Sequence, residues 1–310
     1  MRYRKPGIGF TPDSLARAVG TARRLGKKLY LVMNIYAHNR KIDGFLQTLD
    51  QVAALEPDGI IMSDPGLISL ALKRHPRLKI HLSTQANATN WATVQFWRDL
   101  GLKRIILPRE LHIDEIREIR QKVPDIELES FVHGAICIAY SGRCLISNYL
   151  NHRDANQGTC TNSCRWEYQL AWQKESLRAI EKTQDTYTYT GPPPGQFFIS
   201  ESHRPKRRYP IYEDNKGTYL MNARDLCTVE LLPDIVAAGV GSLKIEGRTK
   251  SAWYVAVTTR SYRRALDNVA AGKAPDPSHL KDLMSLSNRG YTTGFYTRNP
   301  RQYGENMDDG

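Results

Sequence analysis

The same pattern recurs in GIIMSD at residues 59–64, KIHLSTQ at 79–85 and RIILPRE at 104–110. Each stretch opens with a short apolar run, typical of a buried β-strand, and ends in polar residues. Three more stretches follow this pattern: KLYLVMNIY at 28–36, ELESFVHG at 127–134 and SLKIEGR at 242–248. Segments with helical spacing lie between them, at 44–56, 65–75, 90–100 and 111–122. Strand followed by helix, without hairpin turns, predicts an α/β fold with a parallel sheet.

Polar residues gather where these strands end. They are Asn34, Asp64, Gln85, Asn87, Arg109, Glu110, His133, Glu246 and Arg248. In a closed β/α barrel the C-terminal strand ends form the face that carries the chemistry. We therefore expect a TIM-like β/α barrel. A closed barrel has eight strands and only six are evident, so either the sheet is open or the chain begins after the first part of its fold.

The pattern divides the chain into four regions. Residues 1–134 carry barrel strands and helices, and 135–216 form a cysteine-bearing insertion that ends in a basic loop, RPKRRYP at 204–210. Residues 217–290 complete the barrel with C-terminal helices, including a long one after Arg248. Residues 291–310 are polar and expected to be a loose tail.

Charge and hydropathy restrict the partners. The 310 residues have a net charge of +12, which favours a polyanion because each Lys or Arg set against a phosphate releases a counterion. No apolar run approaches the roughly 20 residues that span a bilayer, and no secretory signal opens the chain. We expect a cytoplasmic protein without a membrane partner, in which thiols stay reduced.

All five cysteines lie between positions 137 and 227. The spacing is Cys137-x6-Cys144-x15-Cys160-x3-Cys164, followed much later by Cys227. Four thiolates in one glycine-containing loop suit a 4Fe–4S cluster. A zinc site is the main alternative, although its cysteines come in closer pairs than Cys137 and Cys144. Buried structural thiols are the third interpretation.

The stretch from Glu129 to Tyr168, ESFVHGAICIAYSGRCLISNYLNHRDANQGTCTNSCRWEY, resembles the signature of the collagenase-like peptidase family U-32. Further stretches along the whole chain look like family landmarks: VMNIYAHN, IMSDPG, HLSTQAN, ILPREL, YLMNARDL and SLKIEGRTKS. Together they are most similar to the branch of the family that hydroxylates tRNA.

The resemblance implies a barrel enzyme with a 4Fe–4S cluster. The expected reaction is oxygen-independent conversion of the tRNA wobble uridine to 5-hydroxyuridine, with prephenate as a required co-substrate. Cys137, Cys144, Cys160 and Cys164 match the cysteines of this branch, and Cys227 is kept as a substitute for Cys164. Family members open with two strands that have no counterpart here, which would account for the two missing strands. No electron donor and no oligomeric state follow from the resemblance.

The remaining site residues are assigned by position at the strand ends. We expect His133, Glu129, Arg109, Glu246 and Arg248 to be catalytic, with His133 transferring a proton and the two arginines binding a carboxylate such as prephenate. Substrate binding is assigned to a second set: Asn34, Gln85, Asn87, Arg204, Lys206, Arg207 and Arg208. The last four, from the basic loop, would contact RNA phosphates.

Two other functions remain open. The family label predicts a peptidase, although the sequence contains neither HExxH nor GxSxG. A zinc-stabilised RNA-binding module without catalysis is the second. Hydroxylation of another RNA, such as ribosomal RNA, is a variant of the favoured function.

Overall fold

The computed structural model of the chain describes residues 10–137, 140, 144, 224–247, 250–288 and 290–297. Within 171–219 it also gives the course of five strands. The remaining residues, which include most of the predicted cysteine-bearing insertion, lie outside this description.

A mostly parallel sheet organises the described part of the chain. Neighbouring strands β1 to β5 pair in parallel in their sequence order. They are β1 (Tyr30–Val32), β2 (Gly59–Met62), β3 (Ile80–Leu82), β4 (Arg104–Ile106) and β5 (Glu127–Ala135). A later strand, β12 (Ser242–Ile245), also runs parallel to β5. All six strands predicted from the sequence are therefore present, and the predicted α/β class is confirmed.

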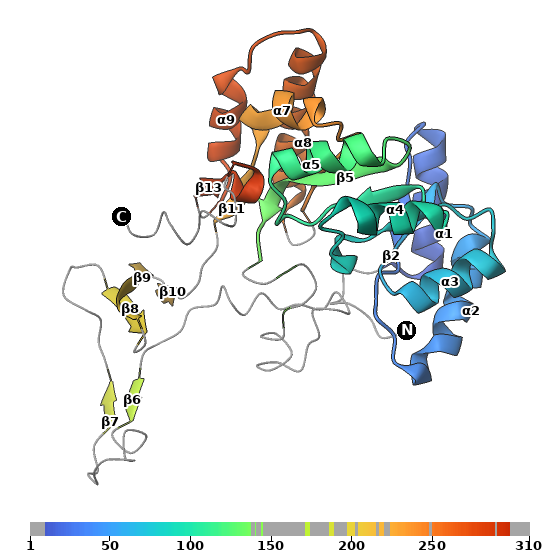
Figure 1. Ribbon diagram of the computed structural model, residues 1–310, viewed down its shortest axis with the longest axis horizontal. Coiled ribbons are helices and arrows are strands. Elements are labelled where there is room, and N and C mark those ends of the chain that lie inside the picture. The colour runs from blue at the N-terminus through green and yellow to red at the C-terminus, as the bar shows by residue number, and fades with distance from the viewer. Residues whose placement is uncertain are drawn as a thin grey trace.

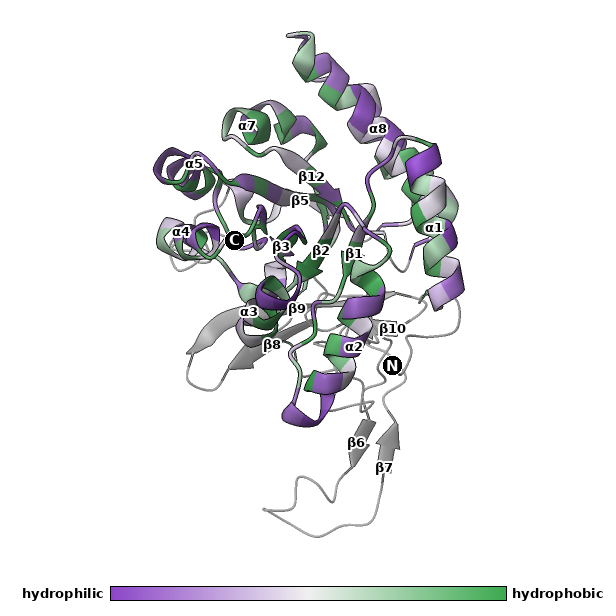
Figure 2. Ribbon diagram, turned by 90° about the vertical axis from the view of Figure 1, so that its right-hand side faces the viewer, coloured by the Kyte–Doolittle hydropathy of each residue, from purple (hydrophilic) through white to green (hydrophobic). Residues whose placement is uncertain are grey.

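Helices connect these strands and cover the sheet. Figure 2 shows them as an arc around the strands. The helices are α1 (Pro12–Arg24), α2 (Ile42–Ala53), α3 (Pro65–Arg74), α4 (Trp91–Asp99), α5 (Ile113–Lys122), α7 (Leu232–Ala237), α8 (Ala252–Ala270) and α9 (Pro277–Met284). Local signals set their starts: Asp64 Oδ1 accepts a hydrogen bond from the Leu67 amide at 3.1 Å, and Pro65 occupies the first turn of α3. Within the described residues, no helix combines the length and the apolar character needed to cross a membrane.

Strand β5 is longer than its neighbours and shares one edge between two partners. Its first part pairs with β12, and its last part pairs in antiparallel fashion with β11 (Asp225–Cys227), which in turn pairs with β13 (Tyr291–Thr292). Figure 1 shows β11 and β13 beside the end of β5. Neither β11 nor β13 was predicted from the sequence, because each strand is too short to show an alternating pattern.

The sheet is open among the described residues. Its hydrogen-bonded order runs from β1 to β13, with β12 attached to β5, and no described pairing joins β1 to the far end. The closed TIM-like barrel is thus not found, whereas the parallel strands and surrounding helices that such a barrel requires are present. Strands β2, β3 and β4 are buried along their whole length.

Two regional predictions are corrected. The supposedly loose tail begins with an ordered segment, since β13 and the short helix at Gly294–Thr297 pack on the sheet. Tyr296 is buried there, and its hydroxyl donates to the Phe131 carbonyl at 2.7 Å. The predicted basic loop RPKRRYP instead lies in a strand, β9 (Arg204–Asp214), which pairs with β8 (Phe197–Glu201) and β10 (Gly217–Tyr219). A separate pair is formed by β6 (Ala171–Gln173) and β7 (Thr186–Thr188).

Candidate functional site

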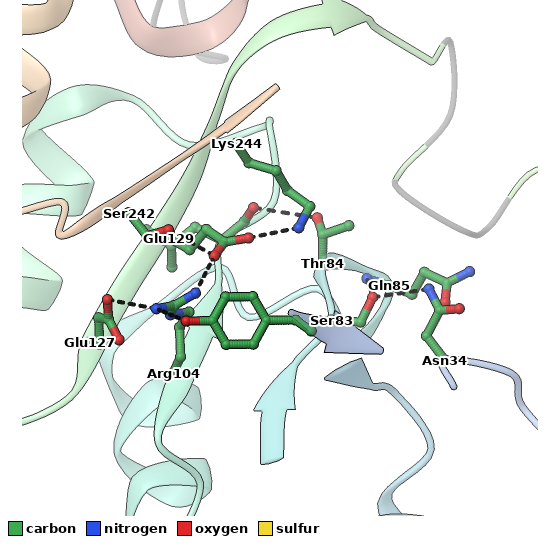
Figure 3. Close-up of polar contacts among 11 residues, drawn as sticks. Asn34, Ser83, Thr84, Gln85, Arg104, Glu127, Glu129, Ser242 and Lys244 are labelled. Atoms are coloured by element: carbon green, nitrogen blue, oxygen red, sulfur yellow. Dashed lines mark hydrogen bonds and ion pairs between the residues drawn. The ribbon is translucent and has the colours of Figure 1, made fainter. Parts of the chain in front are cut away.

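Three predicted substrate-binding residues lie together where β1 and β3 end. Asn34 Nδ2 donates to Ser83 Oγ at 3.3 Å (Figure 3). Ser63 Oγ donates to Gln85 Oε1 at 3.0 Å. Asn87, two residues beyond Gln85, has a φ of 52°, a left-handed conformation that asparagine tolerates. These hydrogen bonds join the ends of β1, β2 and β3 into one polar cluster, in which Ser63, Ser83 and Gln85 are buried. The sequence prediction that these strand ends converge is confirmed.

Glu129 lies inside the sheet at the centre of an ion-pair network (Figure 3). Its carboxylate accepts hydrogen bonds from Arg104 Nη1 at 2.8 Å, Ser242 Oγ at 2.9 Å and Lys244 Nζ at 2.7 Å. Burial raises the pKa of Glu129, but Lys244, Ser242 and Arg104 together outweigh it, so this pKa lies below its usual value. Both carboxylate oxygens are thus engaged with the protein itself. The geometry favours a structural anion over the catalytic group that the sequence suggested.

Arg109 follows β4 and lies against the end of β5. Its guanidinium carbon is 3.6 Å from the centre of the Phe131 ring. Burial lowers the pKa of Arg109, while the negative charges of Cys137 and Glu246 oppose that shift. An arginine in such surroundings stays protonated, because its intrinsic pKa is above 12. The structure therefore brings Arg109, Glu246 and Cys137 into one neighbourhood, as expected for a site at the strand ends.

His133 is completely buried near the end of β5. Three tyrosine rings surround it, with centroid distances of 5.8 Å to Tyr254, 5.4 Å to Tyr262 and 5.3 Å to Tyr291. Burial lowers the pKa of His133 to about 4, and Lys250 adds to the shift while Asp225 opposes it. The imidazole is consequently neutral near pH 7, as a proton acceptor must be.

The structure adds residues that sequence reasoning missed. Asp225 is fully buried on β11, and its Oδ2 lies 3.6 Å from Lys250 Nζ. The Lys250 ammonium also lies 4.7 Å from the centre of the Tyr254 ring. Asp225 belongs to the family landmark YLMNARDL, so the resemblance could have indicated this residue. The sequence shows no strand pattern that predicts β11.

Three of the five cysteines fall in the described residues. Cys137 is exposed, Cys144 is half-buried and Cys227 is buried. Cys137 comes two residues after the end of β5. Cys227 differs, since burial raises the pKa of its thiol and the Tyr262 hydroxyl lies 3.7 Å from its sulfur. Cys160 and Cys164 lie outside the described residues, and the residues that are described contain no group of three metal-binding side chains.

Five further predicted site residues cannot be placed by their side chains. Arg248 lies outside the described residues. The other four are in β9, where only the strand is described: Arg204, Lys206, Arg207 and Arg208. Their assignments stay predictions.

Comparison with known proteins shows which proteins and which family this chain resembles. A "tRNA hydroxylation protein P" of Haemophilus influenzae is 49% identical over 97% of this chain and 68% of its own length. The protein of the same description in Escherichia coli is 47% identical over 97% of the chain and 69% of its own length. The "23S rRNA 5-hydroxycytidine C2501 synthase" of Escherichia coli is 30% identical over 85% of the chain and 35% of its own length.

The chain thus spans about two thirds of the length of the first two relatives. A solved structure described as the U32 peptidase Mk0906 overlaps 41% of this chain and 53% of its own, at 24% identity and a TM-score of 0.35, which is too low to add to the fold assignment. The model of peptidase family U32 matches residues 1–306. The chain therefore belongs to peptidase family U32.

Proposed function

We propose that this chain takes part in RNA hydroxylation, with tRNA as substrate. The reaction would convert the wobble uridine to 5-hydroxyuridine without molecular oxygen and with prephenate as co-substrate. The observation that carries the proposal is the similarity to tRNA hydroxylation proteins over 97% of the chain. The net charge of +12 suits an RNA substrate.

We further propose that four of the five cysteines hold a 4Fe–4S cluster, with Cys137, Cys144, Cys160 and Cys164 as the preferred set. Such a cluster supplies single-electron transfer. The exposed thiol of Cys137 near the cationic Arg109 supports this choice, because a cluster with four thiolates is anionic. The buried, hydrogen-bonded Cys227 is the substitute ligand.

The chain's own residues would bind and orient the substrate. His133 is neutral and buried, which suits a proton acceptor shielded from water. Arg109 and Arg248 would bind the carboxylates of prephenate, and the basic residues of β9 would contact RNA phosphates. An anticodon loop presents unpaired bases, so no duplex has to be opened.

A complementation experiment tests the reaction. A bacterial strain without its own tRNA hydroxylation proteins is given this gene, and its tRNA nucleosides are measured by mass spectrometry. We expect 5-hydroxyuridine to reappear, and to stay absent with the Cys137→Ser variant. Unchanged wobble uridine despite normal protein abundance would contradict the proposal.

Iron and sulfide analysis tests the cofactor. Protein purified without oxygen should contain about four iron and four sulfide per chain, the composition of this cluster type. Five single Cys→Ser variants then identify the ligands: the four ligand variants should lose iron, and the fifth should retain it. If Cys227→Ser retains its iron, the preferred set of four ligands is supported. If Cys164→Ser retains its iron, Cys227 replaces Cys164 as the fourth ligand. A protein with one zinc and no iron would contradict the cluster.

Ribosomal RNA is the second candidate substrate, because one relative is described as a 23S rRNA 5-hydroxycytidine synthase. The same mass spectrometry on ribosomal RNA distinguishes the two. Peptidase activity is the other alternative, and it predicts protein cleavage that survives removal of iron.

A further inference from the structure

Buried polar atoms without hydrogen-bond partners concentrate beside the end of β5. Four of the eleven such atoms in the described residues are His133 Nε2, both carboxylate oxygens of Asp225 and the Tyr254 hydroxyl. None of the four has a hydrogen-bond partner there, and Asp225 Oδ2 has only the ion pair with Lys250 at 3.6 Å. His133 and Asp225 are 0% exposed and Tyr254 is 4% exposed. Each such atom costs free energy, so several together indicate a place that a ligand completes. We call this group the acceptor site.

Neighbouring contacts show that these atoms form one site. Cys227 of β11 pairs directly with His133 of β5, so Asp225 lies two residues along the same strand. The His133 ring contacts the Tyr254 ring, and Lys250 lies against both Asp225 and Tyr254. Three elements, β5, β11 and the start of α8, thus contribute one side chain each.

Tyr262 fixes the tautomer of His133. Its hydroxyl donates to the Val132 carbonyl at 2.7 Å and accepts from the Thr228 amide at 3.0 Å. Its single proton is therefore in use, and towards His133 Nδ1, 3.4 Å away, it can only accept. The tautomer with its proton on Nδ1 is the one that makes this hydrogen bond, and it leaves Nε2 as a bare lone pair. The site then offers acceptors from His133 and Asp225, and donors from Lys250 and the Tyr254 hydroxyl.

Charge restricts the ligand. Within the acceptor site, the carboxylate of Asp225 faces the ammonium of Lys250 at 3.6 Å. The two groups offset each other, so the described side chains of the site leave no unpaired cation for a dicarboxylate such as prephenate. No three of these side chains are arranged to hold a metal ion within the described structure. A neutral, planar ligand with a hydrogen-bond donor fits both the charge and the tyrosine rings.

We propose that the acceptor site binds the Watson–Crick edge of a uracil base, with Asp225 accepting from N3–H. The Watson–Crick edge of uracil presents two carbonyl acceptors, with the N3–H donor between them. The site offers the complementary set: Lys250 and the Tyr254 hydroxyl can donate, and the Asp225 carboxylate between them in this scheme accepts. Cytosine lacks the central donor, so Asp225 rejects it. Tyr262 is a positioning residue, because it acts through His133. The inference rests on the proposed function and adds the residues that recognise the base.

The test measures binding of synthetic anticodon stem-loops to the cluster-loaded protein without co-substrate. Three loops differ only at the wobble position, which carries uridine, 3-methyluridine or cytidine. The wild type should bind the uridine loop at least about tenfold more tightly than the other two, because a buried acceptor rejects a base that lacks the donor. Asp225→Ala should bind all three alike, and Tyr254→Phe should show a smaller loss. The exposed-site control Asp50→Ala should keep the wild-type preference.

The outcomes separate this inference from the proposed function. Wild-type protein that restores 5-hydroxyuridine in cells but binds the three loops equally would overturn the acceptor site and leave the function intact. Retained preference in a folded Asp225→Ala protein would overturn it as well. Protein that neither binds RNA nor restores the nucleoside would overturn both. The tautomer is checked separately by imidazole ¹⁵N shifts: His133 should be protonated at Nδ1 in the wild type, and this preference should weaken in Tyr262→Phe.

Discussion

Two buried carboxylates on adjacent strands of one sheet have opposite surroundings. Glu129 on β5 is 5% exposed and accepts hydrogen bonds from three side chains. Asp225 on β11 is 0% exposed and accepts none among the described residues, with only Lys250 at 3.6 Å. Burial alone therefore does not identify a functional acid. A satisfied carboxylate stabilises the fold, whereas an unsatisfied one is a cost that binding can offset.

The largest effect is expected from Glu129→Gln. The amide removes the counter-charge of Arg104 and Lys244, and breaking a buried pair in this way costs about 3–5 kcal/mol. Urea unfolding measures the change. The matched control is Glu127→Gln, since Glu127 pairs with the same arginine at 2.8 Å but its side chain is 43% exposed. The control should lose less than about 1 kcal/mol of unfolding free energy. Equal losses in the two variants would refute the structural role of Glu129.

The sequence predicted where Glu129 and His133 lie in the fold, but it did not predict what each of them does there. Glu129 and His133 lie four residues apart on one predicted strand, so the sequence pattern alone placed both of them in the sheet. The side chains that contact Glu129 could not be predicted from the sequence. Arg104, Lys244 and Ser242 come from other strands, and only the fold supplies the register of those strands against β5. Asp225 was missed for the same reason, since a three-residue strand is defined by its neighbours and not by its own periodicity.

The second prediction concerns the pH dependence of stability and uses one buried histidine near each carboxylate, His81 near Glu129 and His133 near Asp225. Burial lowers the pKa of His81, near Arg104, and of His133 to about 4, against 6.5 in the unfolded chain. Between these values the unfolded state binds more protons, so stability should fall as the pH is lowered from about 6.5 to about 4.5. Among the described residues, every carboxyl group with a shifted pKa has a lowered one and keeps its contribution to stability in this window.

His81→Leu isolates one of these contributions. It should make the dependence of unfolding free energy on pH shallower, by at most about 2 kcal/mol across the window. Urea unfolding at several pH values measures the slope. An unchanged slope would show that His81 is not held neutral by burial.

Tyr296→Phe tests the segment that the sequence analysis took for a loose tail. Its hydroxyl donates to the Phe131 carbonyl and contacts Ser130, both on β5 beside Glu129. Loss of this buried hydroxyl should cost about 1–2 kcal/mol, because the carbonyl is left without its donor. The control Tyr140→Phe changes an exposed ring and should have no effect. Equal unfolding curves for all three proteins would mean that the segment does not dock on β5.

The smallest effect is also opposite in sign. Asp225→Asn replaces a buried ion that has no hydrogen-bond donor with a neutral amide, while Lys250, whose side chain is 19% exposed, remains in contact with water. The stability should therefore stay equal or rise, within about 1 kcal/mol. Loss of the uridine preference in Asp225→Ala would complete the contrast with Glu129→Gln, since asparagine keeps an acceptor oxygen and alanine does not. A loss of stability above about 2 kcal/mol would instead place Asp225 with Glu129 as a structural anion, because only a carboxylate that the fold itself uses is costly to remove.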